Sequence, residues 1–407
     1  MSIKDNSGYK AARFCLILFS FFTICSFLYA LITQRYNGDF MGTHVDLPLW
    51  TLVLNLVLTL APYFFTWILY KKFKKSEVTR AITIPIQFFG VFLIFIIIWN
   101  ILVTLAFGVG VLGAPLYEAP IFIKPFIQIL NRFHYVYGGM LYILVSGKRN
   151  RTQFLIVFLL IILAYLRAGL GIFLYFGLTF SIKYFDEMWK VIKEKLLVAV
   201  IVLFTFPILV GLLYDLRSAL RNSDEQATSL TSKDLIFGKL IGRLSSFSNS
   251  AMILQEAPYF FYNAQSLSPY YFQQQAIGGM ISVNLMPKLY PENLLINVFG
   301  GDSEYVSYMV GTQGGWYIAA MKSLNVLMLN LFTVLVCVLL TFYFFRFMRF
   351  ENANEYAFML VLYPLTSGVA NEYSQLVLST LIYIVLFLLV NYYQSKTLRV
   401  ENPKLRN

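Results

Sequence analysis

Apolar runs of about 20 residues recur from one end of the chain to the other, and they limit its possible folds more than any other feature. A run of that length can cross a hydrocarbon core of about 30 Å as an α-helix. The runs do not alternate in polarity, as the strands of a transmembrane barrel do. With 58% hydrophobic and 13% charged residues in 407, the chain also has too little polar surface for a soluble globule. The sequence therefore predicts an all-α polytopic integral membrane protein.

Basic residues predict how the chain crosses the membrane, because short connectors rich in Lys and Arg stay cytoplasmic. Such connectors alternate with others that are poor in positive charge, which predicts about ten transmembrane helices with both termini cytoplasmic. The predicted spans are 11–32, 48–70, 81–107, 124–145, 153–166, 170–184, 196–213, 319–346, 356–365 and 376–393.

These spans divide the chain into three parts. Residues 1–213 form an N-terminal bundle of seven spans, residues 214–321 form one large external (periplasmic) loop, and residues 322–407 form a C-terminal bundle of three spans with a cytoplasmic tail. Within the loop, 229–244 and 269–281 have helical patterns, whereas 300–302 and 311–315 are typical of turns.

The formal net charge of +12 follows from the basic connectors, so it indicates orientation and no nucleic-acid partner. Cys15, Cys25 and Cys337 lie in apolar runs, where they behave as small hydrophobic residues. Their positions predict neither a disulfide framework nor a metal site.

Arg167 is the most informative single residue, because it joins two apolar runs with almost no polar loop between them. A guanidinium in the apolar region costs about 2.5 kcal/mol or more at the helix centre and less near the interface, so a partner is expected. That partner could be a phosphate, which the forked donors of Arg fit. Alternatively, the Arg167 side chain could extend (snorkel) to the membrane interface, or it could pair with an internal carboxylate such as Glu372.

Two further cations lie in the large loop. Arg243 follows a predicted helix and could reach back over the bundle, with Lys239 one turn earlier on the same face. Together with Arg167 they could hold both phosphates of a lipid-linked diphosphate. A solvated loop charge is the alternative for each.

The loop also contains the candidates for acid–base chemistry, Glu256, Asp302 and Glu304. A carboxylate in a partly apolar cleft can take a proton from a sugar hydroxyl. A surface charge or a turn cap is the alternative for each of them. The aromatic stretch 259–271 suits packing against sugar rings, and it equally suits anchoring at the membrane interface.

The pattern resembles the O-antigen polymerases (Wzy) and related oligosaccharide repeat-unit polymerases. Three features carry the resemblance: the basic turn 148–151, the tight hairpin 166–171, and a large loop with an arginine before its last apolar return. The stretch 304–315 is similar to the segment that ends that loop in the family. The arginine-to-glycine spacing described for some family members is not matched after Arg243.

The resemblance implies transfer of a glycan from undecaprenyl diphosphate to a second lipid-linked repeat unit, at the periplasmic face of a bacterial inner membrane. Arg167 and Arg243 would stabilise the departing diphosphate. The resemblance implies no metal and no cofactor, and it implies undecaprenyl-diphosphate-linked oligosaccharides, membrane lipids and a chain-length regulator protein as partners. The related ligases use a loop histidine, which residues 214–321 lack, and the polymerase base stays unassigned.

Two other classes remain open. A membrane glycosyltransferase that uses polyprenyl phosphate sugars would place acidic residues in the first outer loop, where Asp39 and Asp46 lie, and such enzymes often bind a divalent metal. A flippase or other transporter of lipid-linked oligosaccharides would place its charges inside the bundle and would not need so large a loop.

Overall fold

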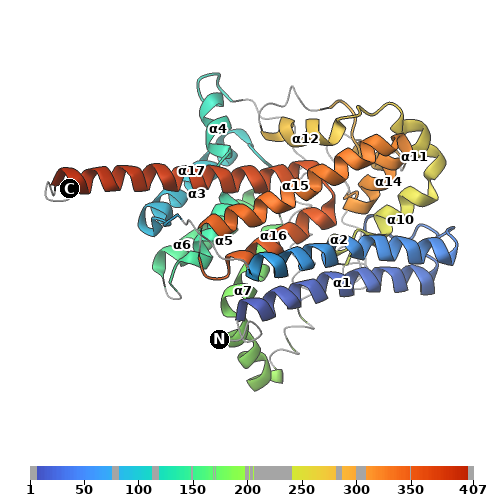
Figure 1. The fold of residues 1–407 in the computed structure, drawn as a ribbon, viewed down its shortest axis with the longest axis horizontal. Helices are drawn as coiled ribbons and strands as arrows, with labels where there is room; N and C mark the ends of the chain where they lie inside the picture. The colour runs from blue at the N-terminus through green and yellow to red at the C-terminus, as the bar shows by residue number, and fades with distance from the viewer. Residues whose placement is uncertain are drawn as a thin grey trace.

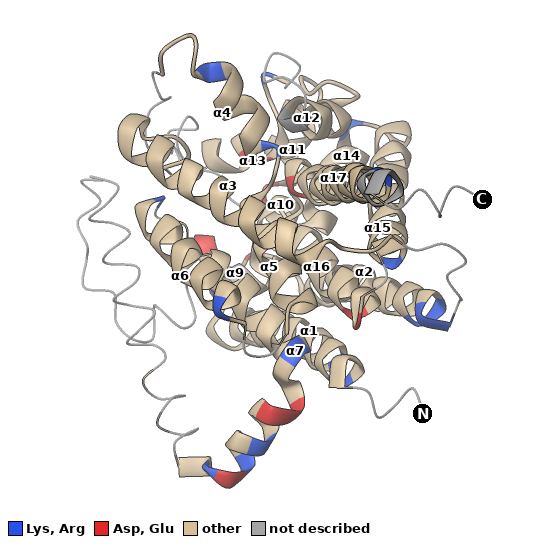
Figure 2. Ribbon diagram, turned by 90° about the vertical axis from the view of Figure 1, so that its left-hand side faces the viewer, with Lys and Arg blue, Asp and Glu red and all other residues tan. Residues whose placement is uncertain are grey.

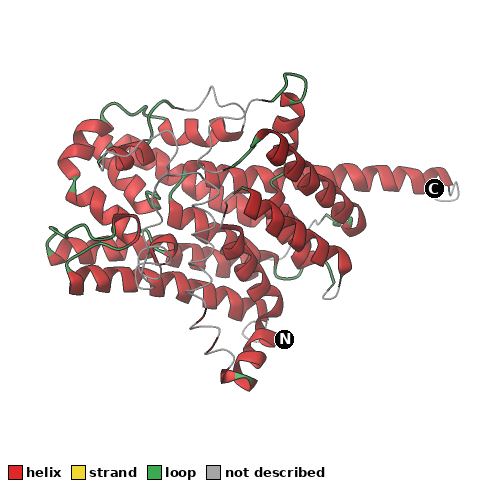
Figure 3. Cartoon of the chain, turned by 180° about the vertical axis from the view of Figure 1, so that it is seen from behind, coloured by secondary structure: helices red, strands yellow, loops and turns green. Residues whose placement is uncertain are grey.

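The computed structural model describes residues 7–75, 82–111, 119–147, 150–167, 169, 171–197, 201, 205, 241–280, 287–298, 309–348 and 350–401. Within these ranges every regular element is helical, as the sequence predicts (Figure 3). One isolated β-bridge also occurs there, between Arg35 and His44. The first elements are α1 (Ser7–Thr33), the 3-10 turn η2 (Gly38–Phe40), α2 (Leu49–Lys75), α3 (Ile86–Phe107), α4 (Lys124–Asn131), α5 (Tyr135–Val145), α6 (Arg151–Leu166) and α7 (Gly171–Glu194). They are followed by α9 (Gly242–Leu244), α10 (Phe247–Gln255), α11 (Ala257–Ala264), α12 (Tyr271–Met280), α13 (Pro291–Asn297), α14 (Thr312–Lys322), α15 (Leu324–Met348), α16 (Ala353–Ser367) and α17 (Ala370–Glu401).

Five of these helices are long and apolar enough to cross a membrane: α1, α2, α3, α15 and most of α17. Many of their large hydrophobic side chains point outward, among them Phe21, Phe95 and Phe332, which are 56%, 53% and 63% exposed. The buried face of α1 instead carries small and polar residues, among them Ala11 and Ser26. This inverted arrangement is stable where the surroundings are as apolar as the core, so these helices are built for lipid contact.

The predicted fourth span, 124–145, is wrong as a single helix. The structure divides it into α4 and α5, and His134 between them has an extended backbone while its ring accepts a hydrogen bond from the Tyr137 backbone N–H. This side-chain cap satisfies one of the free N–H groups at the start of α5, which favours a new helix over a continuous one.

The part of the large loop that the structure describes does not stand apart from the bundle. Helices α10, α11 and α14 gather where α1 ends and α2 begins, an end of the bundle that we call the loop end (Figure 1). α10 packs against α1, α2 and α14, and α12 lies along α17. The loop helices are therefore an integral layer of the helical assembly.

A network of neutral polar side chains holds α10 in place. Its Ser250 hydroxyl donates to the side-chain amide oxygen of Asn55 at 2.9 Å, and the side-chain amide of Gln313 on α14 donates to the Ser250 hydroxyl at 2.9 Å. The hydroxyl of Tyr317 donates to the same Asn55 oxygen at 3.0 Å. Serine and asparagine side chains can enter an apolar bundle in this way because each finds a partner on a neighbouring helix.

Two glycines let α14 meet the turn between α16 and α17. The Gly311 N–H donates to the Ser367 carbonyl oxygen at 2.8 Å, and a Cβ on Gly368 would lie 2.2 Å from the Gly311 carbonyl carbon. α14 begins at Thr312, directly after Gly311, so the predicted turn at 311–315 is wrong beyond its first residue.

Charged residues are sparse along the bundle helices and concentrate at their ends and on the last turns of α7 (Figure 2). Among the described residues one ion pair is largely shielded from solvent: Lys74 of α2 lies 2.5 Å from the Glu355 carboxylate of α16, which also accepts from the Tyr70 hydroxyl at 3.0 Å. The pair joins α2 to α16 at the end of the bundle opposite to the loop end.

Candidate functional site

Arg167 is held where three helices meet. It is the residue that ends α6, and its own N–H donates to the Leu163 carbonyl of that helix at 3.0 Å. The side chain is 9% exposed and lies against α3 and the start of α5. α7 begins at Gly171, four residues after Arg167, as the tight hairpin in the sequence predicts.

Each partner of the guanidinium among the described residues is neutral. Its Nε donates to the Thr104 hydroxyl at 2.9 Å, its Nη2 to the Asn100 amide oxygen at 2.8 Å, and its Nη1 to the Tyr135 hydroxyl at 3.2 Å. The Tyr135 ring also faces the guanidinium carbon, with its centroid 5.1 Å away. These contacts orient the cation without cancelling its charge.

The partners are themselves oriented by backbone groups. The Asn100 amide donates to the Ile96 carbonyl at 2.8 Å, which turns its oxygen toward Arg167, and the Thr104 hydroxyl donates to the Val109 carbonyl at 2.9 Å. A Cβ on Gly110 would lie 2.9 Å from the guanidinium carbon, and this residue has φ +78°, so glycine is required there. The site is therefore preorganised around the cation.

No carboxylate among the described residues pairs with Arg167. Glu372, the predicted internal partner, lies in the first turn of α17 and accepts a hydrogen bond from the Ser367 hydroxyl. Of the five guanidinium N–H groups, three have partners among these residues. Two N–H groups therefore have no partner among the described residues.

Most of the other predicted site residues lie where the structure does not test their relation to Arg167. Arg243 lies in α9, which packs against α1 and η2, and its side chain is outside the described residues. Lys239, Asp302 and Glu304 also lie outside the described residues.

Glu256 belongs to a second group at the loop end, which we call the outer polar cluster and define as Tyr36, His44, Asp46, Gln255 and Glu256. The Gln255 amide oxygen accepts from the Tyr36 hydroxyl at 2.8 Å and from the Asp46 N–H at 3.0 Å, and its nitrogen donates to the Asp46 carboxylate at 3.2 Å. The His44 Nδ1 lies 2.9 Å from the same carboxylate. Burial, followed by the charges of Asp46 and Glu256, raises the pKa of the Tyr36 phenol. No residue that forms these hydrogen bonds also hydrogen-bonds to the Arg167 guanidinium.

A buried carboxyl that the sequence does not reveal lies in α13. Glu292 is 3% exposed, its Oε1 accepts from the Gln275 amide at 3.3 Å, and its Oε2 has no partner within the described residues. Burial raises its pKa from 4.5 to about 7. Nothing in the stretch Pro-Glu-Asn-Leu-Leu separates this glutamate from an exposed one in the first turn of a surface helix.

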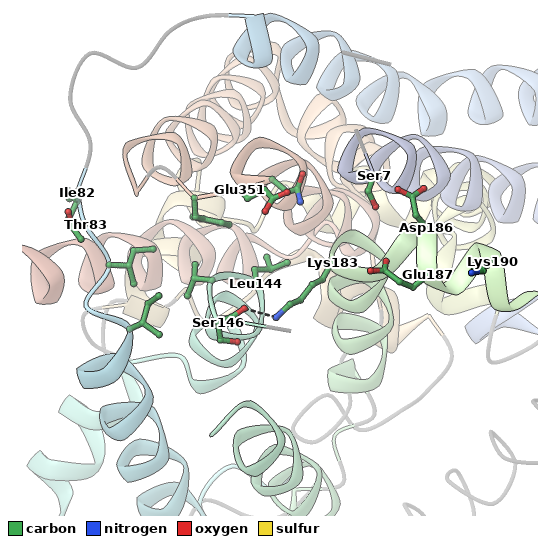
Figure 4. A pocket seen from close by; sticks show the side chains of 16 residues that line it. Ser7, Ile82, Thr83, Leu144, Ser146, Lys183, Asp186, Glu187, Lys190 and Glu351 are labelled. Carbon is green, nitrogen blue, oxygen red and sulfur yellow. Dashed lines mark hydrogen bonds between the residues drawn. The ribbon is translucent and has the colours of Figure 1, made fainter. Parts of the chain in front are cut away.

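A cavity of about 930 Å³ lies at the end opposite to the loop end (Figure 4). It is lined by charges of both signs, including Lys183, Asp186, Glu187 and Glu351. Lys183 donates to the Ser146 carbonyl at 2.9 Å and to the Gln153 amide at 3.0 Å, so it caps the end of α5. In the part of the chain that the structure describes, no group of three or more His, Cys, Asp or Glu residues could hold a metal ion.

The partners of Arg167 were only partly visible in the sequence. Asn100 is an amide in the middle of an otherwise apolar run, which is the signal that it faces protein. Threonine occurs in many apolar helices, so Thr104 carries no such signal. Comparison with known proteins adds nothing to the assignment, since no family model, curated protein or solved structure matches the chain.

Proposed function

We propose that the chain polymerises oligosaccharide repeat units carried on undecaprenyl diphosphate into O-antigen or a related surface polysaccharide. One observation carries the proposal: a buried Arg167 whose described partners are neutral, in an all-helical membrane chain. Its chemistry matches a lipid-linked diphosphate, which combines an apolar tail with phosphate oxygens.

In this proposal Arg167 stabilises the departing diphosphate. Negative charge on the leaving phosphate grows as the glycosidic bond breaks, and a preorganised cation in apolar surroundings stabilises that charge without reorganising. Neutral partners suit this role, because an internal carboxylate would compete with the phosphate for the same donors.

The proposal includes the topology that the basic connectors predict. The chain crosses the bacterial inner membrane about ten times, both termini are cytoplasmic, and 214–321 is periplasmic. The outer polar cluster then faces the periplasm, where its carboxylates, amide and phenol offer the hydrogen bonds that sugar hydroxyls accept and donate. We assign this cluster to contacts with the glycan that extends from the lipid.

Deletion of the gene in its host tests the proposed activity. We expect the ladder of surface polysaccharide on a gel to collapse to a single repeat unit on the lipid core. Complete loss of attached glycan would instead contradict a polymerase, because attachment would then have failed as well.

Substitution of Arg167 tests its role. Arg167→Lys keeps the charge but removes the forked geometry, so we expect a shortened or absent ladder at a normal protein level. Arg151→Lys is the matched control, because Arg151 is exposed and begins the same helix. A full-length ladder from Arg167→Lys would remove Arg167 from the mechanism.

A second candidate is a flippase or transporter of lipid-linked oligosaccharides, and the 930 Å³ cavity favours it. A transporter needs access from the end opposite to the loop end, and a polymerase that acts at the loop end does not. Movement of lipid-linked oligosaccharide between vesicle leaflets, with no change in glycan length, would favour this candidate. Activity that depends on a divalent metal would favour a glycosyltransferase that uses polyprenyl phosphate sugars.

A further inference from the structure

Helix α4 is amphipathic and lies at the edge of the assembly. Its contacts with other helices are mainly with α3, and it projects from the bundle (Figure 1). Its polar residues Lys124, Gln128 and Asn131 are spaced four and three apart, which places them on one face. The opposite face carries Phe126 and Ile129, which are 60% and 61% exposed.

Apolar exposure continues into the turn before α4. Ile121 is 85% exposed and Phe122 is 72% exposed. By contrast, Ile127 is fully buried in a small cluster with Val103 of α3 and Val109. One side chain thus anchors α4 to the protein, while four large hydrophobic side chains point away from it. A short helix of this kind lies in the plane of a membrane surface with its apolar face among the lipid chains.

The segment that contains α4 both leaves and returns at the Arg167 site. Before α4, Gly110 packs on the guanidinium carbon, and Val109 accepts from Thr104, which holds Nε. After α4, Tyr135 accepts from Nη1. The described residues on both sides of α4, at 109–110 and 135, thus contact the Arg167 site, and we treat them with α4 and Arg167 as one unit.

We infer that this unit binds an anionic lipid, with its chains on the Phe126–Ile129 face of α4 and its phosphate at Arg167. Charge complementarity supports this occupant, because Arg167 has no carboxylate partner among the described residues and Lys124 is exposed on the polar face of α4. The identity of the lipid as a glycan carrier rests on the proposed function. The chemical class of the lipid, a phosphate head group on apolar chains, does not rest on the proposed function.

The first experiment measures the position of α4 in the bilayer. A single cysteine is introduced by Phe126→Cys or Asn131→Cys in the full chain with Cys15, Cys25 and Cys337 replaced by alanine, and each is labelled with an environment-sensitive dye in vesicles. We expect phospholipids brominated near the carbonyl end of their chains to quench the dye at residue 126 and not at residue 131. Equal quenching at both positions, or none at either, would overturn the interfacial position.

The second experiment tests the phosphate. A photoreactive phenylalanine analogue at residue 126 is crosslinked in vesicles of ³²P-labelled phosphatidylglycerol and unlabelled phosphatidylcholine. We expect labelled lipid on the protein, reduced roughly fivefold in Arg167→Gln and unchanged in Arg151→Gln. Equal crosslinking in the two variants would overturn the phosphate contact.

The two proposals can fail separately. Neither readout depends on glycan synthesis, so lipid binding with a normal polysaccharide ladder in the gene deletion would reject the polymerase and keep the lipid site. A lost ladder in the gene deletion, together with no lipid crosslinking, would keep the polymerase and reject the lipid site.

Discussion

At the scale of the residue, the neutral partners of Arg167 among the described residues support the proposed anion site. A structural arginine in an apolar bundle is most stable beside a carboxylate, because an unpaired buried charge is costly. The Arg167 guanidinium instead has an amide, a hydroxyl and a phenol as its described partners. The arrangement gives up stability and retains an uncancelled positive charge, which is the expected exchange at a binding site.

Asn100→Asp tests this directly, because it places a carboxylate of nearly the same shape 2.8 Å from Nη2. We expect the thermal midpoint in detergent to rise and the polysaccharide yield in cells to fall by about tenfold, equivalent to ~1.4 kcal/mol of lost anion binding. Both follow from an internal ion pair that displaces the bound phosphate. A higher midpoint with an unchanged ladder would show that Arg167 is only structural.

The raised pKa of Glu292 predicts how the stability of the folded protein depends on pH. Its pKa is raised from 4.5 to about 7 in the folded state, so the folded protein binds more protons than the unfolded chain between these values. The contribution of Glu292 to stability should therefore be most favourable below about pH 4.5, decline as the pH rises toward 7, and then level off, a change of roughly 3 kcal/mol from this group. Glu292→Gln should remove this decline and stabilise the protein at pH 8.

The measurement is the thermal midpoint in detergent at pH 5 and pH 8, which we expect to differ less in Glu292→Gln than in the unmodified chain. Glu256→Gln is the control, because Glu256 is a half-buried carboxylate of the same segment. An equal pH response in both variants would assign the effect to other groups.

At the scale of the element, the contact between α14 and the α16–α17 turn decides how the large loop joins the bundle. Gly368→Ala places a Cβ 2.2 Å from the Gly311 backbone and also strains a residue with φ +73°. We expect a loss of ~1–2 kcal/mol from the backbone strain and ~1–3 kcal/mol more from the overlap.

Gly42→Ala separates the two effects. Gly42 has φ +92°, and a Cβ added there would have no neighbouring atom within 4 Å, so only the backbone strain applies. Thermal midpoints should fall further for Gly368→Ala than for Gly42→Ala. Equal midpoints would mean that α14 and the turn can separate at little cost.

At the scale of the whole molecule, the proposed topology places α11 outside and the end of α7 inside. In a cysteine-free background, Tyr262→Cys on α11 should react with a membrane-impermeant maleimide in cells with a permeabilised outer membrane. Lys190→Cys on α7 should react only after lysis. Both positions are well exposed, so access and not burial decides the result. The opposite labelling pattern would invert the proposed orientation.

Much of the helical assembly could be predicted from residues alone. Long apolar runs require helices, since each backbone group in the apolar core must be satisfied within its own segment. The prediction failed at 124–145, where the His134 side chain caps a new helix, and at 311–315, where a helix begins instead of a turn. In both places a single cap residue decides the boundary, and its geometry depends on neighbouring helices.

The order of residues alone predicts a helical membrane chain and shows that Arg167 is a cation between two apolar runs, because hydrophobicity summed over about 20 residues and the cost of an apolar-region charge are local properties. That Arg167 is buried is shown only by the tertiary structure. Which groups meet that cation is settled only by the packing of the helices. Asn100 and Tyr135 come from helices that are distant in the sequence, and Glu292 is buried by packing that no local pattern records. The sequence leaves these partners open because many packings satisfy the same apolar runs.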